Sequence, residues 1–463
     1  MTNEAAFIAS HRFGLGPKPG ELRAVQSDPR GWLREQVGQS ALPTDFPSGA
    51  DITEIIDLNL GEDPSFRRSE EGRGQQRQRR RQAMAQVDAR LRYRMQTDTP
   101  FAERLVAFWS NHFSFSVDGI PGFMGRTGAA AFEQDVIRPH VFGTFEELAF
   151  RALTYPAMVA YLDNDRSVGP NSVVGGGARA VINENLARET LELYVMGVDG
   201  GYNQADVEQM ALVLTGWSYR QQRMRGYTRR AQRRSPGSER MERYGQAEFF
   251  PMLHEPGTKT IAGMTFEEAG ADEFRNVIRA LTSHPSTAQY IAAKLARHFI
   301  SDTPSQASIQ RLATTFRETE GNLEAVSLQL INLDEAWEQP LRKIKTPYDF
   351  VLAVGRATGL GDEDRYRARS SLASLGQPMF GAPDPRGWPD DEVSWVTPAK
   401  LKRRVEWVSD QARRRFKQTD PRQFLIDAVG DLASDRLRRA VRGAPSRGEG
   451  VAIVLLSPEF QRR

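Results

Sequence analysis

Cysteine is absent from all 463 residues of the chain. This absence excludes disulfide bridges, thiolate nucleophiles, cysteine-bound zinc and iron–sulfur clusters, because each of them needs a cysteine sulfur. It does not fix the compartment, since a chain without cysteine is stable in either redox environment. Short motifs for other chemistry are also missing: there is no HExxH, no GxSxG and no nucleotide P-loop.

Long apolar runs are missing as well. No stretch reaches the roughly 18 apolar residues that a membrane-spanning helix needs. The first residues, "MTNEAAFIASHRFGLGPKPG", have neither a basic region followed by an apolar core nor a twin-arginine signal. From these features we expect a soluble cytoplasmic protein without a transmembrane segment.

What is present points to a mostly α-helical fold. Apolar residues recur with helical spacing in many segments, for example at Val87, Leu91 and Met95. Asn203 and Asp206 have the spacing of a capping box at the start of another helix. Alternating, strand-like patterns are scarce. With 39% hydrophobic and 26% charged residues, we predict one large multi-helix domain over residues 1–463, with long Pro/Gly loops.

Two arginine-rich segments, 67–81 and 218–246, interrupt this pattern as insertions or linkers. One interpretation is a patch for phosphate groups or an anionic polymer. The other is a solvated loop and a basic helix face, which is the usual role of charge runs. The net charge is only +3, and no nucleic-acid-binding motif is recognisable, so we do not expect a nucleic-acid partner.

The segment "NENLARETLE" is unusually polar for a helix that is otherwise rich in leucine. On a helix that starts near residue 183, Asn185, Glu189 and Glu192 share one face, and Glu184 can pair with Arg188. These groups could bind a divalent cation or supply a general acid or base. They could equally stabilise the helix terminus through its dipole and through ion pairs.

Several isolated polar residues are further candidates. His112 shares a helix face with apolar residues and is expected in the core or in a pocket wall, with Asn111 beside it. Asp163 in "YLDND" could ligate a hard cation or only end a helix.

Three more features come from the second half of the chain. His254 and Lys259 lie in a predicted loop. Lys294 and His298 are four residues apart on one helix face, which we expect at the surface. A long Pro/Gly-rich segment holds Trp388 and Trp395, which we expect either to hold it against the helices or to form a carbohydrate platform.

The same segments carry a family resemblance. "FWSNHF", "NENLARETLELYVMGVDGGYNQADVEQMALVLTGW", "HPSTAQYIAAKLARHFI", "IKTPYDFVLAVGRATG" and "LGQPMFGAPDPRGWP" resemble, in this order, the bacterial family catalogued as domain of unknown function 1800. The resemblance covers nearly the whole chain and implies a helical protein of this size. It does not supply a reaction.

The resemblance implies a set of site residues. We expect a polar pocket formed by the family's motif side chains, Asn183, Asn185, Arg188 and Glu189, together with Asn111 and His112. The candidate catalytic residues are Glu184, Arg188, Glu189 and His112, and the candidate substrate-binding residues are Asn111, Asn183, Asn185, Trp217, His254, Lys259 and Trp388. A divalent cation would have Glu189, Glu192 and Asp163 as its candidate ligands. The alternative is a buried polar network that only holds helices together.

Two function hypotheses follow. In the first, the chain is an enzyme that acts on an anionic or carbohydrate-type envelope substrate. In the second, it is a non-catalytic binding or escort protein. Family members are often exported and encoded beside a second family with a twin-arginine leader, so the resemblance implies a partner protein of that kind. Co-export with such a partner to the periplasm is the alternative to a cytoplasmic location.

Overall fold

A computed structural model describes residues 3–44, 46, 51–61, 65, 69–122, 124–176, 181–359 and 367–463. The first half of the chain contains, in order, α1 (Asn3–Phe7), the π-helix η1 (Ile8–Phe13), α2 (Glu21–Val25), α3 (Pro29–Arg34), α4 (Ile52–Gly61), α6 (Glu70–Gln96), α7 (Pro100–His112), α8 (Gly125–Phe132), η2 (Glu133–Ile137), α9 (Arg138–His140), α10 (Phe145–Thr154), α11 (Pro156–Tyr161), η3 (Asn164–Arg166), α12 (Asn185–Glu189), η4 (Thr190–Val195) and α13 (Gln204–Val213).

The second half contains β1 (Trp217–Ser218), α14 (Met224–Arg234), β2 (Glu242–Tyr244), β3 (Ala247–Phe249), η5 (Pro251–Leu253), β4 (Lys259–Ile261), β5 (Met264–Phe266), α15 (Ala271–Thr282), α16 (Pro285–Phe299), α17 (Gln306–Glu318), α18 (Leu323–Asn332), η6 (Asp334–Trp337), α19 (Pro347–Thr358), α20 (Ala368–Ser374), α21 (Pro398–Arg415), α22 (Pro421–Ala428), η8 (Gly430–Leu432), α23 (Asp435–Arg442), α24 (Arg447–Leu456) and α25 (Pro458–Gln461). The prediction of a mostly helical protein is confirmed.

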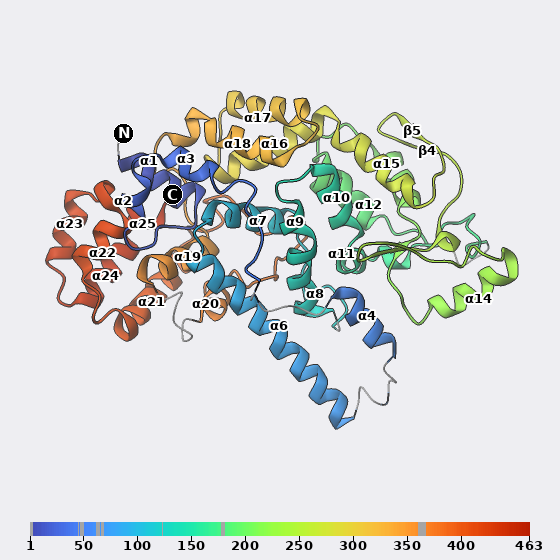
Figure 1. Cartoon of the computed structure of the whole chain (residues 1–463), viewed down its shortest axis with the longest axis horizontal. Coiled ribbons are helices and arrows are strands. Elements are labelled where there is room, and N and C mark those ends of the chain that lie inside the picture. The colour runs from blue at the N-terminus through green and yellow to red at the C-terminus, as the bar shows by residue number, and fades with distance from the viewer. Residues whose placement is uncertain are drawn as a thin grey trace.

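The described strands form two small antiparallel sheets. In the first, β3 lies between β1 and β2, with Trp217 opposite Phe249. In the second, β4 pairs with β5 as a hairpin. Both sheets lie on the same side of the molecule as α14 and α15 (Figure 1). No helix among the described residues is long and apolar enough to span a membrane.

The predicted helices form because local patterns and caps agree. Val87, Leu91 and Met95 are all buried on α6. The side chain of Asn203 accepts hydrogen bonds from the first turn of α13, and Asp206 closes the predicted capping box. Such agreement between local signals is what makes a helix boundary readable from sequence.

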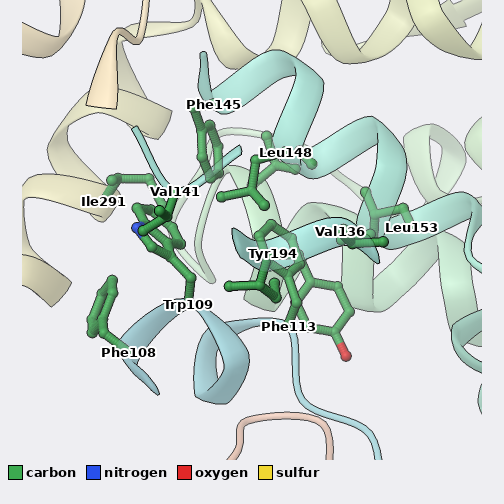
Figure 2. Close-up of a cluster of buried hydrophobic side chains, with 14 of the residues drawn as sticks. Phe108, Trp109, Phe113, Val136, Val141, Phe145, Leu148, Leu153, Tyr194 and Ile291 are labelled. Carbon is green, nitrogen blue, oxygen red and sulfur yellow. The ribbon is translucent and has the colours of Figure 1, made fainter. Parts of the chain in front are cut away.

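The largest core cluster surrounds α7. Phe108, Trp109 and Phe113 pack there against side chains from α10, η4 and α16, among them Phe145, Tyr194 and Ile291 (Figure 2). A second cluster joins α19, α21, α22, α23 and α24. α7 therefore lies deep in the molecule, and a cavity beside it can be shielded from water.

The arginine-rich segments have regular structure. The described part of the first segment, 69–81, is the N-terminal half of α6, which extends away from the body of the molecule (Figure 1). Arg67 and Arg68 lie outside the described residues. The second segment, 218–246, includes α14 and β2.

Candidate functional site

The "NEN" segment begins a short helix whose polar groups act mostly on one another. α12 starts at Asn185, two residues later than expected, and continues into the π-helix η4. Asn183 accepts a hydrogen bond from the backbone N–H of Asn185 at 2.8 Å. Glu184 and Arg188 form an ion pair of 3.0 Å in which both side chains are more than one-third exposed. These contacts are those of a helix N-terminus with a surface ion pair.

The carboxylates considered for a metal do not assemble into a ligand set. Within the described ranges, no group of three or more His, Asp or Glu side chains is arranged to hold a metal ion. Asp163 has a left-handed backbone conformation, with φ of 56°, and pairs with Arg166 at 3.2 Å. Glu189 and Glu192 are half-buried. Burial, together with Glu192 and Asp384, raises the pKa of Glu189.

His254 and Lys259 belong to a closed internal network. The two ring nitrogens of His254 contact the carbonyl oxygen of Thr215 at 2.8 Å and a carboxylate oxygen of Glu273 at 3.0 Å. Lys259 pairs with the same carboxylate at 3.0 Å and donates to the carbonyl of Glu255. These groups fasten β4 to α15, and every nitrogen of the histidine has a partner.

Trp217 is also part of the interior. Its side chain is 1% exposed and packs against Phe150, Tyr244 and Phe249. Its place is the core beneath the first sheet.

A cavity of about 570 Å³ lies beside α7. Much of its wall is formed by side chains from α7, α16, the start of α19 and the segment 376–397. These elements contain four of the segments on which the family resemblance rests: "FWSNHF", "HPSTAQYIAAKLARHFI", "IKTPYDFVLAVGRATG" and "LGQPMFGAPDPRGWP". Segments that are far apart in the chain therefore meet at one concave site of the size that small-molecule ligands use.

Asn111 holds the Trp388 segment against α7. Its side-chain amide donates to the carbonyl of Trp388 at 2.9 Å and accepts from the N–H of the same residue at 2.7 Å. Gly387 sits immediately before, with φ of +81°, and a Cβ there would come within 2.3 Å of the Asn111 carbonyl. The glycine is needed for this close approach. Both Asn111 and Trp388 line the cavity.

His112 lines the cavity too, and its Nδ1 is buried without a hydrogen-bond partner among the described residues. Its Nε2 contacts the carbonyl oxygen of Tyr194 at 2.9 Å, which requires that this nitrogen carries the proton. Burial holds the pKa of His112 well below its usual value. The ring is therefore neutral at pH 7 and packs against Trp109 and Phe113.

The cationic side of the cavity comes from α16. Tyr290, Lys294, Arg297 and His298 all line it. The Lys294 ammonium lies 5.5 Å from the centre of the Tyr290 ring. Neither Lys294 nor Arg297 forms a hydrogen bond or ion pair through its side chain with any described residue. Burial lowers the pKa of Lys294 to about 8.

Lys294 and His298 thus differ from the sequence-based expectation of a surface face. The i, i+4 spacing correctly placed both residues on one face of a helix, but that face forms the wall of a cavity. Local spacing predicts which residues share a helix face, but it does not predict which part of the chain packs against that face.

His298 is oriented by a carboxylate. Its Nδ1 contacts Oδ2 of Asp390 at 2.8 Å, and its Nε2 is buried without a hydrogen-bond partner among the described residues. Burial lowers the pKa of His298 and outweighs the raising effect of Asp390. Burial also acts to raise the pKa of Asp390, but His298, Lys343 and Arg463 outweigh it and hold that pKa well below its usual value.

The protonation states follow from this geometry. An ionised Asp390 can only accept a hydrogen bond, so Nδ1 carries the proton and the neutral imidazole has its lone pair on Nε2. A histidine whose second nitrogen is fixed by a carboxylate has the arrangement of a general base.

The other acidic groups of the wall are already neutralised or hydrogen-bonded. Glu133 pairs with Arg94 and Arg138 at 2.9 and 3.1 Å. Asp349 pairs with Arg104 at 3.1 Å, and Asp302 pairs with Lys343 at 2.7 Å. Asp391 accepts the backbone N–H of Ser394. Among the described residues of the wall, the cations without an ion-pair partner are the half-buried Lys294 and the exposed Arg297.

The residues expected in one polar pocket lie in two places. Asn111 and His112 line the cavity, as does the separate candidate Trp388, whereas Asn183, Asn185, Arg188 and Glu189 do not. The part of their segment that reaches the wall is Leu193 of η4, whose carbonyl accepts the hydroxyl of Tyr290 at 2.7 Å. The "NEN" motif therefore supports the cavity from outside through η4.

The chain belongs to the family described as "Protein of unknown function (DUF1800)", whose model matches residues 8–462. No curated protein and no solved structure matches the chain.

Proposed function

We propose that this protein is an enzyme that binds a small anionic substrate in the cavity beside α7 and transfers protons through His298. The observation that carries the proposal is the pair Lys294 and Arg297. Both cations line one cavity, both lack a counter-ion in the described structure, and His298 is on the next turn of the same helix.

The electrostatics favour an anion. Removing an ammonium from water without a partner is costly, and a second cation nearby adds to the cost. An anionic group in the cavity would relieve both by accepting charge-assisted hydrogen bonds from Lys294 and Arg297. We infer that an oxyanion, carboxylate or phosphate, is held there.

The chemistry would come from His298 and Asp390. With Nδ1–H fixed by Asp390, the free Nε2 can take a proton from a substrate or from a water molecule held beside it. Asp390 stays ionised and stabilises the imidazolium that forms. Asn111 and Trp388 would shape the same site, since they fix the loop that carries Asp390.

Anion binding is tested by calorimetric titration of inorganic phosphate, sulfate and acetate into the purified protein. We expect binding to the wild type, loss of binding in Lys294→Met, and weakened binding in Arg297→Met. Lys402→Met, on the exposed face of α21, is the matched control. Phosphate affinity that is unchanged in Lys294→Met would contradict the proposal.

The acid–base role is tested with p-nitrophenyl phosphate as a chromogenic probe. We expect His298→Gln to keep its phosphate affinity and to lose a factor of about 10²–10⁴ in turnover, the usual contribution of a general base. Equal turnover by wild type and His298→Gln would remove His298 from the mechanism.

A second function has its own observation, and we propose it alongside the first: docking of an acidic partner protein on the free half of α6. Arg77, Arg80 and Arg81 are exposed there and have no ion-pair partner among the described residues. This half of the helix extends into solvent (Figure 1).

Charge reversal tests the docking surface. A fluorescein-labelled oligoglutamate peptide should bind the wild type, and the triple variant Arg77→Glu, Arg80→Glu, Arg81→Glu should lose it. Reversal of Arg229 and Arg233 on α14 is the control. Tighter binding of duplex DNA than of the peptide would favour a nucleic-acid partner instead.

A further inference from the structure

Much of the cavity wall is apolar. Phe108 and Phe113 come from the end of α7, Phe115 follows them, Phe132 ends α8, and Met379 and Phe380 belong to the 376–397 segment. α8 and α16 lie on opposite sides of α7 in Figure 1. The cavity therefore has cationic side chains on α16 and apolar side chains on other parts of its wall, among them Phe132 of α8.

An inorganic anion would leave most of this space to water. A water molecule occupies about 30 Å³ of liquid, so an oxyanion of five heavy atoms fills roughly a quarter of the cavity of about 570 Å³. An apolar body that replaced water along this wall would gain roughly 25 cal/mol per Å² of apolar surface buried. The volume and its apolar wall call for a ligand with an apolar part.

Two further charges of the wall do not compete for the ligand. Glu133 and Arg94 line the cavity, but they neutralise each other at 2.9 Å within a buried cluster that also includes Glu103 and Arg138. Tyr348 accepts a further hydrogen bond from Arg94. Lys294 and Arg297, the described cations of the wall without an ion-pair partner, both come from α16.

From this arrangement we infer that the ligand is amphipathic, with one anionic group held by Lys294 and Arg297 and an apolar acyl or aryl body along Phe115, Phe132 and Met379. This inference rests on the proposed anion site and adds the class of molecule. The reacting bond then lies near the anionic end, within reach of His298.

The test is a titration series with the full-length protein. The probes are inorganic phosphate, the carboxylates from acetate to decanoate in steps of two carbons, 3-phenylpropionate, and octanol as a body without charge. We expect Kd to fall about fourfold for each added methylene until the cavity is full, the factor for burying one CH₂. Octanol should bind much more weakly than octanoate.

Two variants separate the ends of the ligand. Lys294→Met should abolish binding of every carboxylate. Met379→Ser should weaken octanoate about tenfold and leave phosphate unchanged, while the volume-conserving Met379→Leu should bind octanoate like the wild type. A preference for 3-phenylpropionate over hexanoate would identify an aryl body, and the reverse order an acyl body.

Each failure points to a different error. Binding of phosphate and acetate with no gain from chain length would overturn the amphipathic ligand and leave the anion site standing. Octanol binding as tightly as octanoate would remove the role of the cations and with it the proposed function. No binding by any probe would overturn both.

Discussion

Two clusters in this protein each contain a histidine, a lysine and an acidic residue. They differ in how many of these side chains have hydrogen-bond or ion-pair partners. His254, Lys259 and Glu273 form the first, which we call the closed cluster, under the β4–β5 hairpin. His298, Lys294 and Asp390 form the second, which we call the open cluster, at the cavity beside α7. In both, a histidine contacts a carboxylate at about 3 Å and a lysine lies near.

The difference lies in what each donor and acceptor faces. Both ring nitrogens of His254 have acceptors, and Lys259 has a carboxylate and a carbonyl. His298 has one free nitrogen, and Lys294 has no ionic partner among the described residues. A buried polar network whose charges are paired rigidifies a fold, whereas buried titratable groups without partners in a cavity mark a candidate binding site. Residue type alone does not separate the two cases.

The largest effect should come from breaking the closed cluster. Glu273→Gln leaves Lys259 buried without a counter-charge, and we expect about 3–5 kcal/mol of lost stability. Urea denaturation followed by circular dichroism measures it. Asp272→Asn, on the exposed side of the same helix turn, should cost less than about 1 kcal/mol. Equal effects of the two variants would show that the closed cluster is not structural.

An effect of opposite sign is expected at the open cluster. Burial lowers the pKa of Lys294 from 10.5 to about 8, so the charged form destabilises the folded state at pH 7 by at most about 3 kcal/mol. Lys294→Met should therefore raise stability at pH 7. Lys343→Met should lower it, because Lys343 pairs with Asp302 and Asp390.

The pH dependence of folding stability tests the role of Lys294 directly. Between pH 8 and 10.5 the unfolded chain binds more protons at Lys294 than the folded one, so this residue makes the stability of the wild type rise with pH. Below pH 8 its penalty is fully present. The advantage of Lys294→Met over the wild type should thus shrink as pH increases from 8 to 10.5. A constant advantage would mean that Lys294 titrates normally.

The smallest effect should come from the exposed pair of the "NEN" helix. Glu184 and Arg188 are solvent-screened, and Glu184→Gln should change stability by less than about 0.5 kcal/mol. Thermal unfolding at low and at 1 M salt measures this, and high salt should remove the remaining difference. A loss of more than about 2 kcal/mol of folding stability in Glu184→Gln would show that Glu184 belongs to a buried structural network.

Part of the site could be found from the sequence. The expectation that His112 lies in the core or a pocket wall agrees with its position at 2% exposure in the wall of the cavity. In the sequence, only its position beside His112 makes Asn111 a candidate. In the structure, its side chain holds the Trp388 loop through two hydrogen bonds. Trp217, in contrast, is a core residue that its motif made prominent. A motif records that a residue type is required, but it does not say whether packing or binding requires it.

The helical class, many helix boundaries and the family can be predicted from the amino-acid sequence alone. These depend on signals within a few residues of one another, such as the stripe on α6 and the capping box of α13. The candidate site, in contrast, depends on tertiary contacts. His298 meets Asp390 across 92 residues of sequence, and Lys294 is left without a partner because of what packs around it. Whether a polar or charged side chain has a partner depends on the residues that surround it in three dimensions. No local sequence pattern therefore separates the open cluster from the closed one.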